Sequence, residues 1–418
     1  MNSLEGMVIC KSCLDDQYLI KQMLFNKSGQ KQKCTNCNKV RKCVDYKILA
    51  VKLKNVIRNH YSIAEQWERD WEYDNFYSEG ENLQDVIENL IGSISNINSI
   101  IDYICTQDAW DAKDGDNRFF DNTEVYVKKR IYADEFHKQW IDLVTELKTS
   151  RRFFSDNARD LFGQIFKDVE NLISIQNPSI QEPVIRVILN GTPIFRARRA
   201  DTYEECKSYV KNPKKELSPP PSKFAQQGRM NAKGVSVFYG ALNAETCIAE
   251  MRSSIGNYLV LGTFTPVKDL RILDFKRLES VISEISYFQS DARYQILRKQ
   301  FLHKLHDLIS SPVISGYEDE YLITQVLAEY LAYVREKSFD GISFESTQMN
   351  GGTNIIIFPK KNLLVMNVPC MDDVEEVDKD KSVLNDFRLE FINDSVEIRK
   401  TEKIKYETSP LSLGQFLE

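Results

Sequence analysis

The chain has 418 residues, of which 42% are hydrophobic and 28% charged, an ordinary globular composition with room for two or three domains. The formal net charge of −6 excludes a global basic field that would attract nucleic acid, and leaves only a local basic patch open. No apolar run reaches the roughly 18–20 residues that a membrane span needs, and the first residues lack the apolar core of a signal peptide. We therefore expect a cytoplasmic protein without membrane contact, whose nine cysteines are reduced.

Four of the cysteines form two close pairs near the N-terminus. Cys10 and Cys13 make one C-x2-C pair, and Cys34 and Cys37 make a second pair about twenty residues later. A short turn brings both thiolates of such a pair to one side, and four thiolates at tetrahedral angles suit Zn²⁺. The pattern predicts a structural zinc site without an open position for catalytic water. Cys43 could replace one ligand, and ordinary reduced cysteines are the alternative interpretation.

The next part of the chain has helical patterning. Apolar residues recur at steps of three and four from Asn82 to Cys105, and further amphipathic helices are predicted from Glu124 onward and from Asp156 to Ile175. A bundle of four or five helices fits this stretch. Within it, Arg130 and His137 are separated by six residues, a spacing found in HEPN ribonucleases, where the two side chains act on a phosphodiester. Two surface residues on an amphipathic helix are the simpler explanation.

The second half of the chain alternates short β-like runs with helices. Ile194 opens a run in which Arg196 and Arg198 lie two apart, so they point to one face of a strand. Two guanidiniums on one face suit paired phosphates better than a dry core, and a solvated edge strand is the alternative. A Gly-flanked turn containing Arg229 then leads into a strand that ends at Tyr239.

A short helix and a second pair of strands follow. Asn243 can cap a helix over residues 244–252, on which Thr246 and Glu250 lie four apart and share a face. Because that face is small and only weakly polar, we favour a functional carboxylate over an exposed surface glutamate. Further on, Ser346 sits just past a short strand, before a tight Gly-Gly turn and a buried strand.

Two segments look peripheral to this pattern. Residues 201–225 are polar and contain a Ser-Pro-Pro-Pro-Ser run, which predicts an insert or lid without a core of its own. Near the C-terminus the chain is acidic up to Asp380 and then alternates, which predicts a small terminal hairpin or a tail.

In their order along the chain, these motifs resemble the RES domain, a family named for its Arg, Glu and Ser. The likeness is carried by FRARR, GRMNAKGVSVFYGALNAETCIAE and GISFESTQMNGGTNIIIF, and it covers about residues 185–370. It implies an ADP-ribosyltransferase-like fold and consumption of NAD⁺, often as the toxin of a bacterial toxin–antitoxin or phage-defence system. The N-terminal half resembles, less specifically, the HEPN-type helical domain that accompanies some RES domains.

The resemblance also implies site residues. The family's strand arginine corresponds to Arg196 or Arg198, and we favour Arg196 because it follows an aromatic residue. Arg229 matches the turn arginine, Tyr239 the strand tyrosine, and Glu250 the helix glutamate. The family's serine is matched by Ser346. The expected catalytic residues are Glu250, Ser346, Tyr239 and Arg196, and the expected NAD⁺-binding residues are Arg196, Arg198, Arg229, Tyr239 and Ser346.

In the mechanism that this implies, NAD⁺ loses nicotinamide through an oxocarbenium-like transition state. Arg196 and Arg229 would contact phosphate and ribose, Tyr239 would orient the nicotinamide ribose, and Ser346 would position it. Glu250 would stabilise the positive charge. Water, phosphate or a macromolecule as acceptor would give hydrolysis, phosphorolysis or ADP-ribosylation. The sequence leaves these acceptors open, together with the HEPN-type RNA-binding or ribonuclease alternative, an antitoxin or regulatory partner, and a homo-oligomer.

We therefore predict an α+β protein, with an N-terminal zinc knuckle and helical bundle followed by an ADP-ribosyltransferase-like mixed β-sheet domain with flanking helices. The expected parts are a zinc-knuckle segment, a HEPN-like helical domain, the RES domain and a C-terminal extension, at residues 1–48, 49–178, 183–370 and 371–418.

Overall fold

A computed structural model of the chain divides it into two compact units, Met1–Ala133 with Glu284–Leu297, and Asp134–Ser283 with Arg298–Glu418. The fold class is α+β, as predicted. Within these units the structure describes residues 4–64, 68–70, 75–77, 80–108, 118–129, 134–177, 180–282, 285–310, 321–360 and 379–404.

The first unit begins with a small antiparallel sheet of order β1-β3-β2, formed by Val8–Cys10, Val40–Asp45 and Gln30–Lys33. Strand β3 leads directly into helix α3 (Tyr46–His60), because the Asp45 side chain caps the helix by accepting a hydrogen bond from the Lys47 backbone N–H at 2.7 Å. The other helices are α1 (Gln17–Gln22), α2 (Phe25–Ser28), α4 (Leu83–Ile91) and α5 (Ile97–Thr106).

The predicted helical stretch from Asn82 to Cys105 is confirmed as two helices rather than one. Helix α4 ends at Gly92, whose φ of 84° breaks the helical path, and α5 starts five residues later. Both helices turn their apolar faces into the core of this unit, with Val86, Ile87, Ile100 and Ile104 fully buried.

The helix predicted from Glu124 onward is wrong in its first part. Val125–Lys128 is strand β8, which pairs with β4 (Tyr61–Ile63) and β7 (Glu81–Asn82). Tyr126 is 1% exposed while its neighbours are more open, so the segment buries side chains with the period of a strand. Helix α6 starts only at Asp134 and runs to Thr149.

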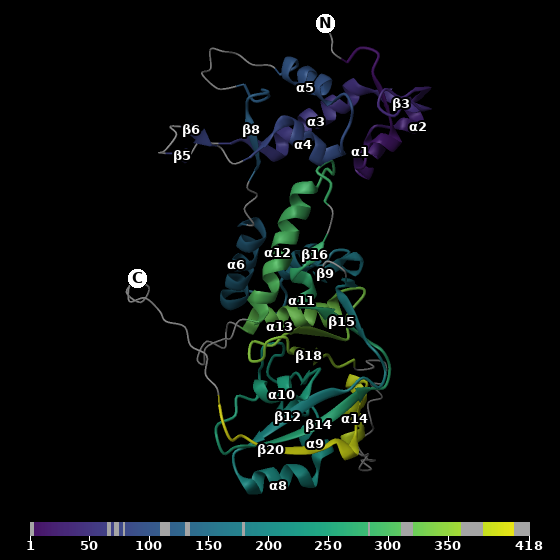
Figure 1. The fold of residues 1–418 in the computed structure, drawn as a ribbon. Helices are drawn as coiled ribbons and strands as arrows, with labels where there is room; N and C mark the ends of the chain where they lie inside the picture. The colour runs from purple at the N-terminus through teal and green to yellow at the C-terminus, as the bar shows by residue number, and fades with distance from the viewer. Residues whose placement is uncertain are drawn as a thin grey trace. The chain divides into compact units, whose positions relative to one another are not determined.

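The second unit is built on a nine-stranded mixed sheet that curls into a half-barrel (Figure 1). Its order is β11-β15-β17-β18-β13-β12-β14-β19, and β20 also pairs with β14. Among the described strands of this sheet, β15 and β17 pair parallel and the other neighbours antiparallel. The strands are β11 (Ile185–Ile188), β12 (Ile194–Ala200), β13 (Phe238–Ala241), β14 (Tyr258–Pro266), β15 (Leu270–Asp274), β17 (Gly341–Glu345), β18 (Thr353–Ile357), β19 (Leu389–Phe391) and β20 (Glu397–Lys400).

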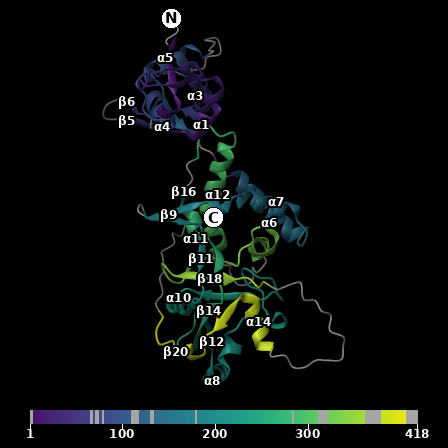
Figure 2. The same ribbon diagram turned by 90° about the vertical axis from the view of Figure 1, so that its right-hand side faces the viewer.

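Helices with an aromatic core pack together in this unit. Trp140 of α6 contacts Phe162 of α7 (Asp156–Ile165) and Phe301 of α12 (Ala292–Ser310), with ring centroids 6.2 and 5.7 Å apart. Tyr330, directly after α13 (Leu322–Glu329), lies 5.5 Å from Phe162. Figure 2 shows α6 and α7 side by side.

The helix predicted from Asp156 to Ile175 is confirmed only as far as Ile165, where α7 ends. Its end is a strand, β9 (Ile173–Asn177), which pairs with β10 (Ile180–Pro183) and β16 (Val281–Ile282). Helices α6 and α7 belong to the same compact unit as the large sheet. The predicted division into four parts was drawn from sequence motifs, which a division by compactness does not test, and it stays a prediction.

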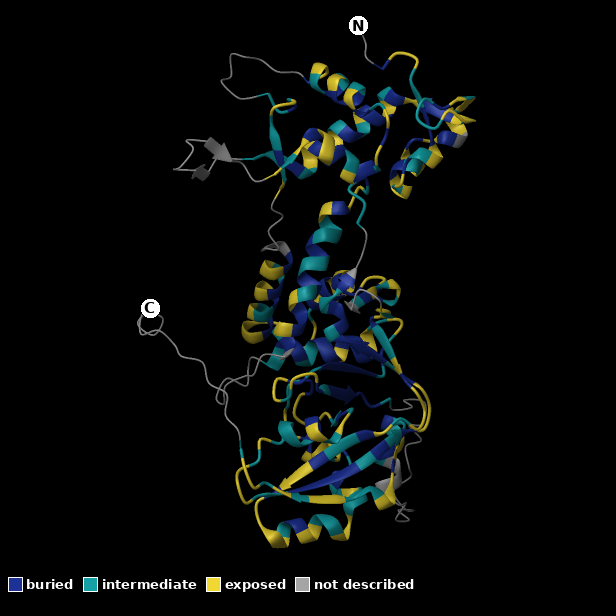
Figure 3. Ribbon diagram, in the orientation of Figure 1, coloured by how far each residue is buried: buried dark blue, intermediate teal, exposed yellow. Residues whose placement is uncertain are grey.

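Residues 201–225, predicted as an insert or lid without a core of its own, contain two helices that share the core of the large sheet. Residues 201–225 form α8 (Tyr203–Lys211) and α9 (Pro213–Leu217), which pack on β12 and β14 and bury Cys206 and Leu217 in the core of the sheet. In Figure 3, α8 is coloured mainly as exposed and intermediate, and its buried residue is Cys206. The polar composition hid this because a short helix needs only one or two apolar residues on its inner face.

The C-terminal segments do not form a hairpin with each other. Strands β19 and β20 each add to β14, and Phe391 packs on Phe264 with ring centroids 5.2 Å apart. Helix α14 (Lys379–Phe387) precedes them and contributes Leu384 and Phe387 to the same core. This end of the chain therefore completes the large sheet.

Candidate active site

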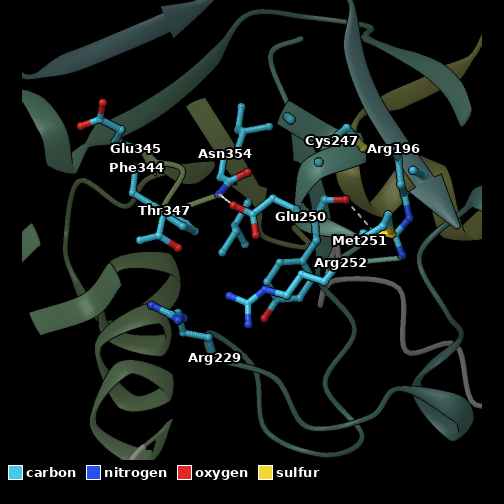
Figure 4. Close-up of a pocket in the computed structure, with 16 residues that line it drawn as sticks. Arg196, Arg229, Cys247, Glu250, Met251, Arg252, Phe344, Glu345, Thr347 and Asn354 are labelled. Carbon is cyan, nitrogen blue, oxygen red and sulfur yellow. Dashed lines mark hydrogen bonds between the residues drawn. The ribbon is translucent and has the colours of Figure 1, made fainter. Parts of the chain in front are cut away.

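A cavity of about 320 Å³ lies where helix α10 (Ala244–Glu250) packs against strands β12, β13 and β18 of the second unit. This volume is at the small end of the range for ligand sites. Its wall holds the charged residues Arg196, Arg229, Glu250, Arg252 and Glu345 (Figure 4). Most of the remaining wall is apolar, which raises the strength of electrostatic contacts inside it.

Glu250, the last residue of α10, is held by two other elements. Its Oε1 accepts hydrogen bonds from the hydroxyl of Ser346 at 2.5 Å and from Nδ2 of Asn354 at 2.7 Å. Ser346 follows β17 and Asn354 lies on β18. Its other oxygen, Oε2, makes no hydrogen bond with a residue that the structure describes. The carboxylate is thus oriented through one oxygen and available to a ligand through the other.

The residues around Thr246 explain how Ser346 comes into contact with Glu250. Asn243 caps α10 by accepting a hydrogen bond from the Thr246 backbone N–H at 2.7 Å, and Thr246 is fully buried. A Cβ on Gly352 would collide with the Thr246 hydroxyl, so only glycine lets this turn approach the helix. The Ser346 N–H donates to the Gly352 carbonyl at 2.8 Å, which brings the serine to Glu250.

Tyr239 fixes the turn that carries Arg229. Its hydroxyl donates to Oδ1 of Asn231 at 2.8 Å and accepts from the Met230 N–H at 3.1 Å. Burial raises the pKa of Tyr239 to about 12, so the hydroxyl keeps its proton at neutral pH. A Cβ on Gly228 would lie 2.6 Å from Asn231 Oδ1 and 2.8 Å from the tyrosine oxygen, which makes glycine necessary there. The hydroxyl is therefore engaged in positioning the turn.

Arg196 and Arg229 are each anchored to the backbone. Nη1 of Arg196, on β12, donates to the Tyr239 carbonyl at 2.7 Å, and its guanidinium lies 5.4 Å from the ring centroid of Phe238. Burial lowers the pKa of Arg196 to about 10, which still leaves it charged at neutral pH. Arg229 donates to the carbonyl of Ile309, and burial lowers its pKa as well.

Two of the predicted residues do not line this cavity. Arg198 is exposed, binds the side chain and backbone carbonyl of Glu216, and lies 4.6 Å over the ring of Tyr209. It lines an adjoining cavity of about 530 Å³, whose wall also contains Arg196. Ser346 is 5% exposed and stands behind Glu250. The structure thus places Arg196, Arg229, Tyr239 and Glu250 in the cavity wall, and Ser346 next to it.

Sequence reasoning missed three residues of the site: Asn231, Asn354 and Arg252. Asn231 and Asn354 are polar residues with 5% and 9% exposure inside otherwise quoted motifs. Asn354 stands in the apolar run TNIIIF, and a single polar residue in a buried strand was the available signal. Arg252 lies two residues past Glu250, where the helical pattern gave it no special place.

The first unit contains the other predicted site. The sulfur atoms of Cys10, Cys13, Cys34 and Cys37 all lie within 4.8 Å of one another. The pairs Cys10–Cys13, Cys10–Cys37 and Cys13–Cys34 are 3.6, 3.7 and 3.9 Å apart. A tetrahedron with Zn–S bonds of about 2.3 Å has edges of about 3.8 Å. The donor set and its geometry therefore fit a structural Zn²⁺.

Cys43 does not belong to this group of ligands. Its thiol donates to the carbonyls of Gln32 at 3.5 Å and Arg41 at 3.4 Å. It lies opposite Cys10 in the β1–β3 pairing, but its sulfur is outside the cluster. Cys43 therefore lies on the strand that pairs with Cys10 and is not one of the four clustered sulfurs.

The HEPN-type pair is only partly placed. Arg130 lies outside the described residues, and His137 is exposed on α6. The ribonuclease alternative gains no support from the placement of His137.

Comparison with known proteins agrees with the geometry of the second unit. The family model of the RES domain matches residues 195–380. No curated protein and no solved structure matches the chain. In the described part of the chain, no helix is long and apolar enough to cross a membrane. The matched stretch includes Arg196, Arg198, Arg229, Tyr239, Glu250 and Ser346. Residues 195–380 are accordingly the part of the chain that is similar to the RES domain.

Proposed function

We propose that the RES domain binds NAD⁺ in the cavity beside Glu250 and breaks the bond between nicotinamide and ribose. The observation that carries this proposal is the Glu250 carboxylate, held at Oε1 by Ser346 and Asn354 in a cavity lined by three arginines. The RES domain belongs to a family of NAD⁺-degrading enzymes, which supports the same reaction.

Cleavage of the bond between nicotinamide and ribose is favoured by a fixed negative charge beside the ribose. As the C–N bond breaks, nicotinamide leaves with the bonding electron pair and positive charge develops at the anomeric carbon. A carboxylate that is already oriented stabilises this charge without reorganising during the reaction. Glu250 supplies that carboxylate, and Oε2 is the oxygen available to the ribose. Ser346 and Asn354 act through Glu250, so they are positioning residues.

The arginines supply the complementary contacts to the substrate. A guanidinium binds phosphate oxygens through charge-assisted, often bidentate, hydrogen bonds. Arg196 and Arg229 each donate one hydrogen bond to a backbone carbonyl, which fixes the orientation of the remaining N–H donors. We expect these donors to bind the pyrophosphate and ribose of NAD⁺.

The acceptor completes the reaction in one of three ways. Water attacking the anomeric carbon gives ADP-ribose and loses a proton, whereas inorganic phosphate gives the 1-phosphate of ADP-ribose. Transfer to a protein or nucleic acid is the third outcome.

We place the enzyme in a bacterial cytoplasm, as a toxin or phage-defence effector. In this proposal an antitoxin or other regulatory partner restrains the enzyme, and copies of the chain associate with one another.

Nicotinamide release from NAD⁺ by the purified full chain tests the proposal, with and without phosphate. Glu250→Gln keeps the shape of the side chain and removes its charge, so turnover should fall by about 10²–10⁴. Glu245→Gln is the matched control, because Glu245 lies on the same helix, is exposed and binds Arg399 at 2.7 Å. Near-normal release by Glu250→Gln would refute the proposal, and radiolabel retained on a macromolecule would identify a transferase.

A further inference from the structure

Arg252 has an unusual backbone conformation at the edge of the cavity. Its φ is 45°, in the left-handed region that a branched or long side chain rarely adopts. It follows the C-cap residue Met251 of helix α10, and its N–H donates to the Ala249 carbonyl at 3.1 Å. Helices usually place glycine at such a position, because glycine has no Cβ to strain. An arginine there costs stability, which a contact with a ligand would offset.

The guanidinium of Arg252 has no partner among the residues that the structure describes. Arg388 offers a comparison, since it is the other described arginine with positive φ, at 55°, and it binds Asp340 at 2.6 Å. Arg196 and Arg229 each donate to a backbone carbonyl. Of the three cavity arginines, Arg252 is therefore the one whose whole donor fork is available to a ligand.

The charge of the cavity favours an anion. Its wall holds three arginines, Arg196, Arg229 and Arg252, and two carboxylates, an excess of one positive charge in a chain whose net charge is −6. A dinucleotide pyrophosphate carries about two negative charges at neutral pH, so its charge is opposite in sign to that of the wall.

Arg252 lines the same cavity as the Glu250 carboxylate. In the view of Figure 4, its side chain is drawn between those of Glu250 and Arg229. Burial lowers the pKa of Arg229, and the nearby charge of Arg252 lowers it further while Glu250 opposes both, which is consistent with this proximity. A ligand held by Arg252 and Arg229 together would therefore be within reach of Glu250.

We propose that Arg252 binds the pyrophosphate of the dinucleotide substrate through its free guanidinium fork, and that its strained backbone conformation is maintained for this contact. The inference rests on the proposed function of the cavity. It adds a substrate-binding residue that stands outside the Arg, Glu and Ser positions for which the family is named.

Binding of ADP-ribose to the full chain, measured by isothermal titration calorimetry, tests this contact apart from turnover. Arg252→Gly and Arg252→Asn both tolerate positive φ and remove the charge. We expect each to weaken ADP-ribose binding by about 10- to 100-fold, the loss of a bidentate charge-assisted contact. Their melting temperatures should equal or exceed that of the wild type, because the strain is relieved. Arg252→Lys should fall in between, since it keeps the charge but loses the fork.

Arg199→Asn is the matched control, because Arg199 is an exposed arginine on β12 that pairs with Asp201 at 3.1 Å and should leave binding unchanged. Unchanged ADP-ribose affinity in Arg252→Asn, or no binding by the wild type, would overturn the inference. If the wild type releases nicotinamide and Arg252→Asn does so with an unaltered KM, the inference fails and the proposed function stands. If Arg252→Asn loses ADP-ribose binding in a protein that releases no nicotinamide, the inference stands and the proposed function fails.

Discussion

The four-cysteine cluster of the first unit and the Glu250 cavity of the second unit are both assembled from short motifs far apart in the chain. They differ in whether their polar groups all have partners within the site. Four thiolates around one Zn²⁺ use every ligand position, and the Cys10 N–H adds a contact of 3.4 Å to the Cys34 sulfur. The cavity leaves Oε2 of Glu250 and the fork of Arg252 without protein partners in the described structure.

This difference is the one expected between a metal site that stabilises a fold and a cavity that binds a ligand. A saturated metal site can only hold its protein segments together. A carboxylate and a guanidinium kept without partners lower stability in the free protein, and that is offset when a substrate supplies the missing contacts. The following predictions test this contrast, from the largest expected effect to the smallest.

The largest effect should come from Cys34→Ser. Because structural zinc contributes about 10–16 kcal/mol of apparent binding free energy in small zinc domains, losing one thiolate should release the metal and unfold the first unit locally. Zinc content by mass spectrometry and limited proteolysis of residues 4–64 would measure this. Cys43→Ser is the control, since that thiol is buried but lies outside the cluster. Full metal content in Cys34→Ser would show that the cluster is not a four-thiolate site.

A smaller effect is expected from the residues that hold Glu250. Ser346→Ala and Asn354→Ala each remove one hydrogen bond to Oε1, and kcat should fall by about 5- to 50-fold, less than in Glu250→Gln. In a Glu250→Gln background neither substitution should lower kcat further, because their effect passes through the carboxylate. Additive losses in the double variants would instead assign Ser346 or Asn354 a direct contact with the substrate.

Tyr239→Phe should affect stability more than turnover. It leaves Oδ1 of Asn231 and the Met230 N–H without their partner, which costs about 1–3 kcal/mol of unfolding free energy. KM for NAD⁺ should rise moderately as the turn with Arg229 loosens, while kcat changes little. Chemical denaturation and steady-state kinetics would measure both. A large loss of kcat with unchanged stability would show that Tyr239 contacts the reacting ribose.

The smallest effect is expected for Arg198→Ala. Arg198 is exposed and engaged with Glu216, and an exposed ion pair contributes about 0–1 kcal/mol. ADP-ribose affinity should change less than threefold, which is about 0.7 kcal/mol, while Arg196→Ala should lower it much more. An equal loss in both variants would place part of the ligand in the adjoining cavity that the two arginines share.

The sequence by itself determined the features that depend on local chemistry. The spacing of Cys10, Cys13, Cys34 and Cys37 is enough to predict a four-sulfur cluster, because each close pair makes its own turn. The order of the Arg, Gly-Arg-x-Asn, Thr-x-x-x-Glu and Ser motifs predicted the RES domain that the family model matches at residues 195–380. Helices α4 and α10 and most strands of the large sheet follow from their apolar periods and caps.

Only the tertiary structure decided which polar groups meet and which elements join the sheet. Ser346 and Asn354 reach Glu250 because β17 and β18 pair beside α10, and no local pattern encodes that contact across about a hundred residues. Likewise, β8 and β20 were misjudged because each is short and owes its structure to neighbours distant in sequence. Arg252 shows the same limit, since its backbone strain, and a guanidinium without a partner among the described residues, exist only once α10 is folded against the cavity.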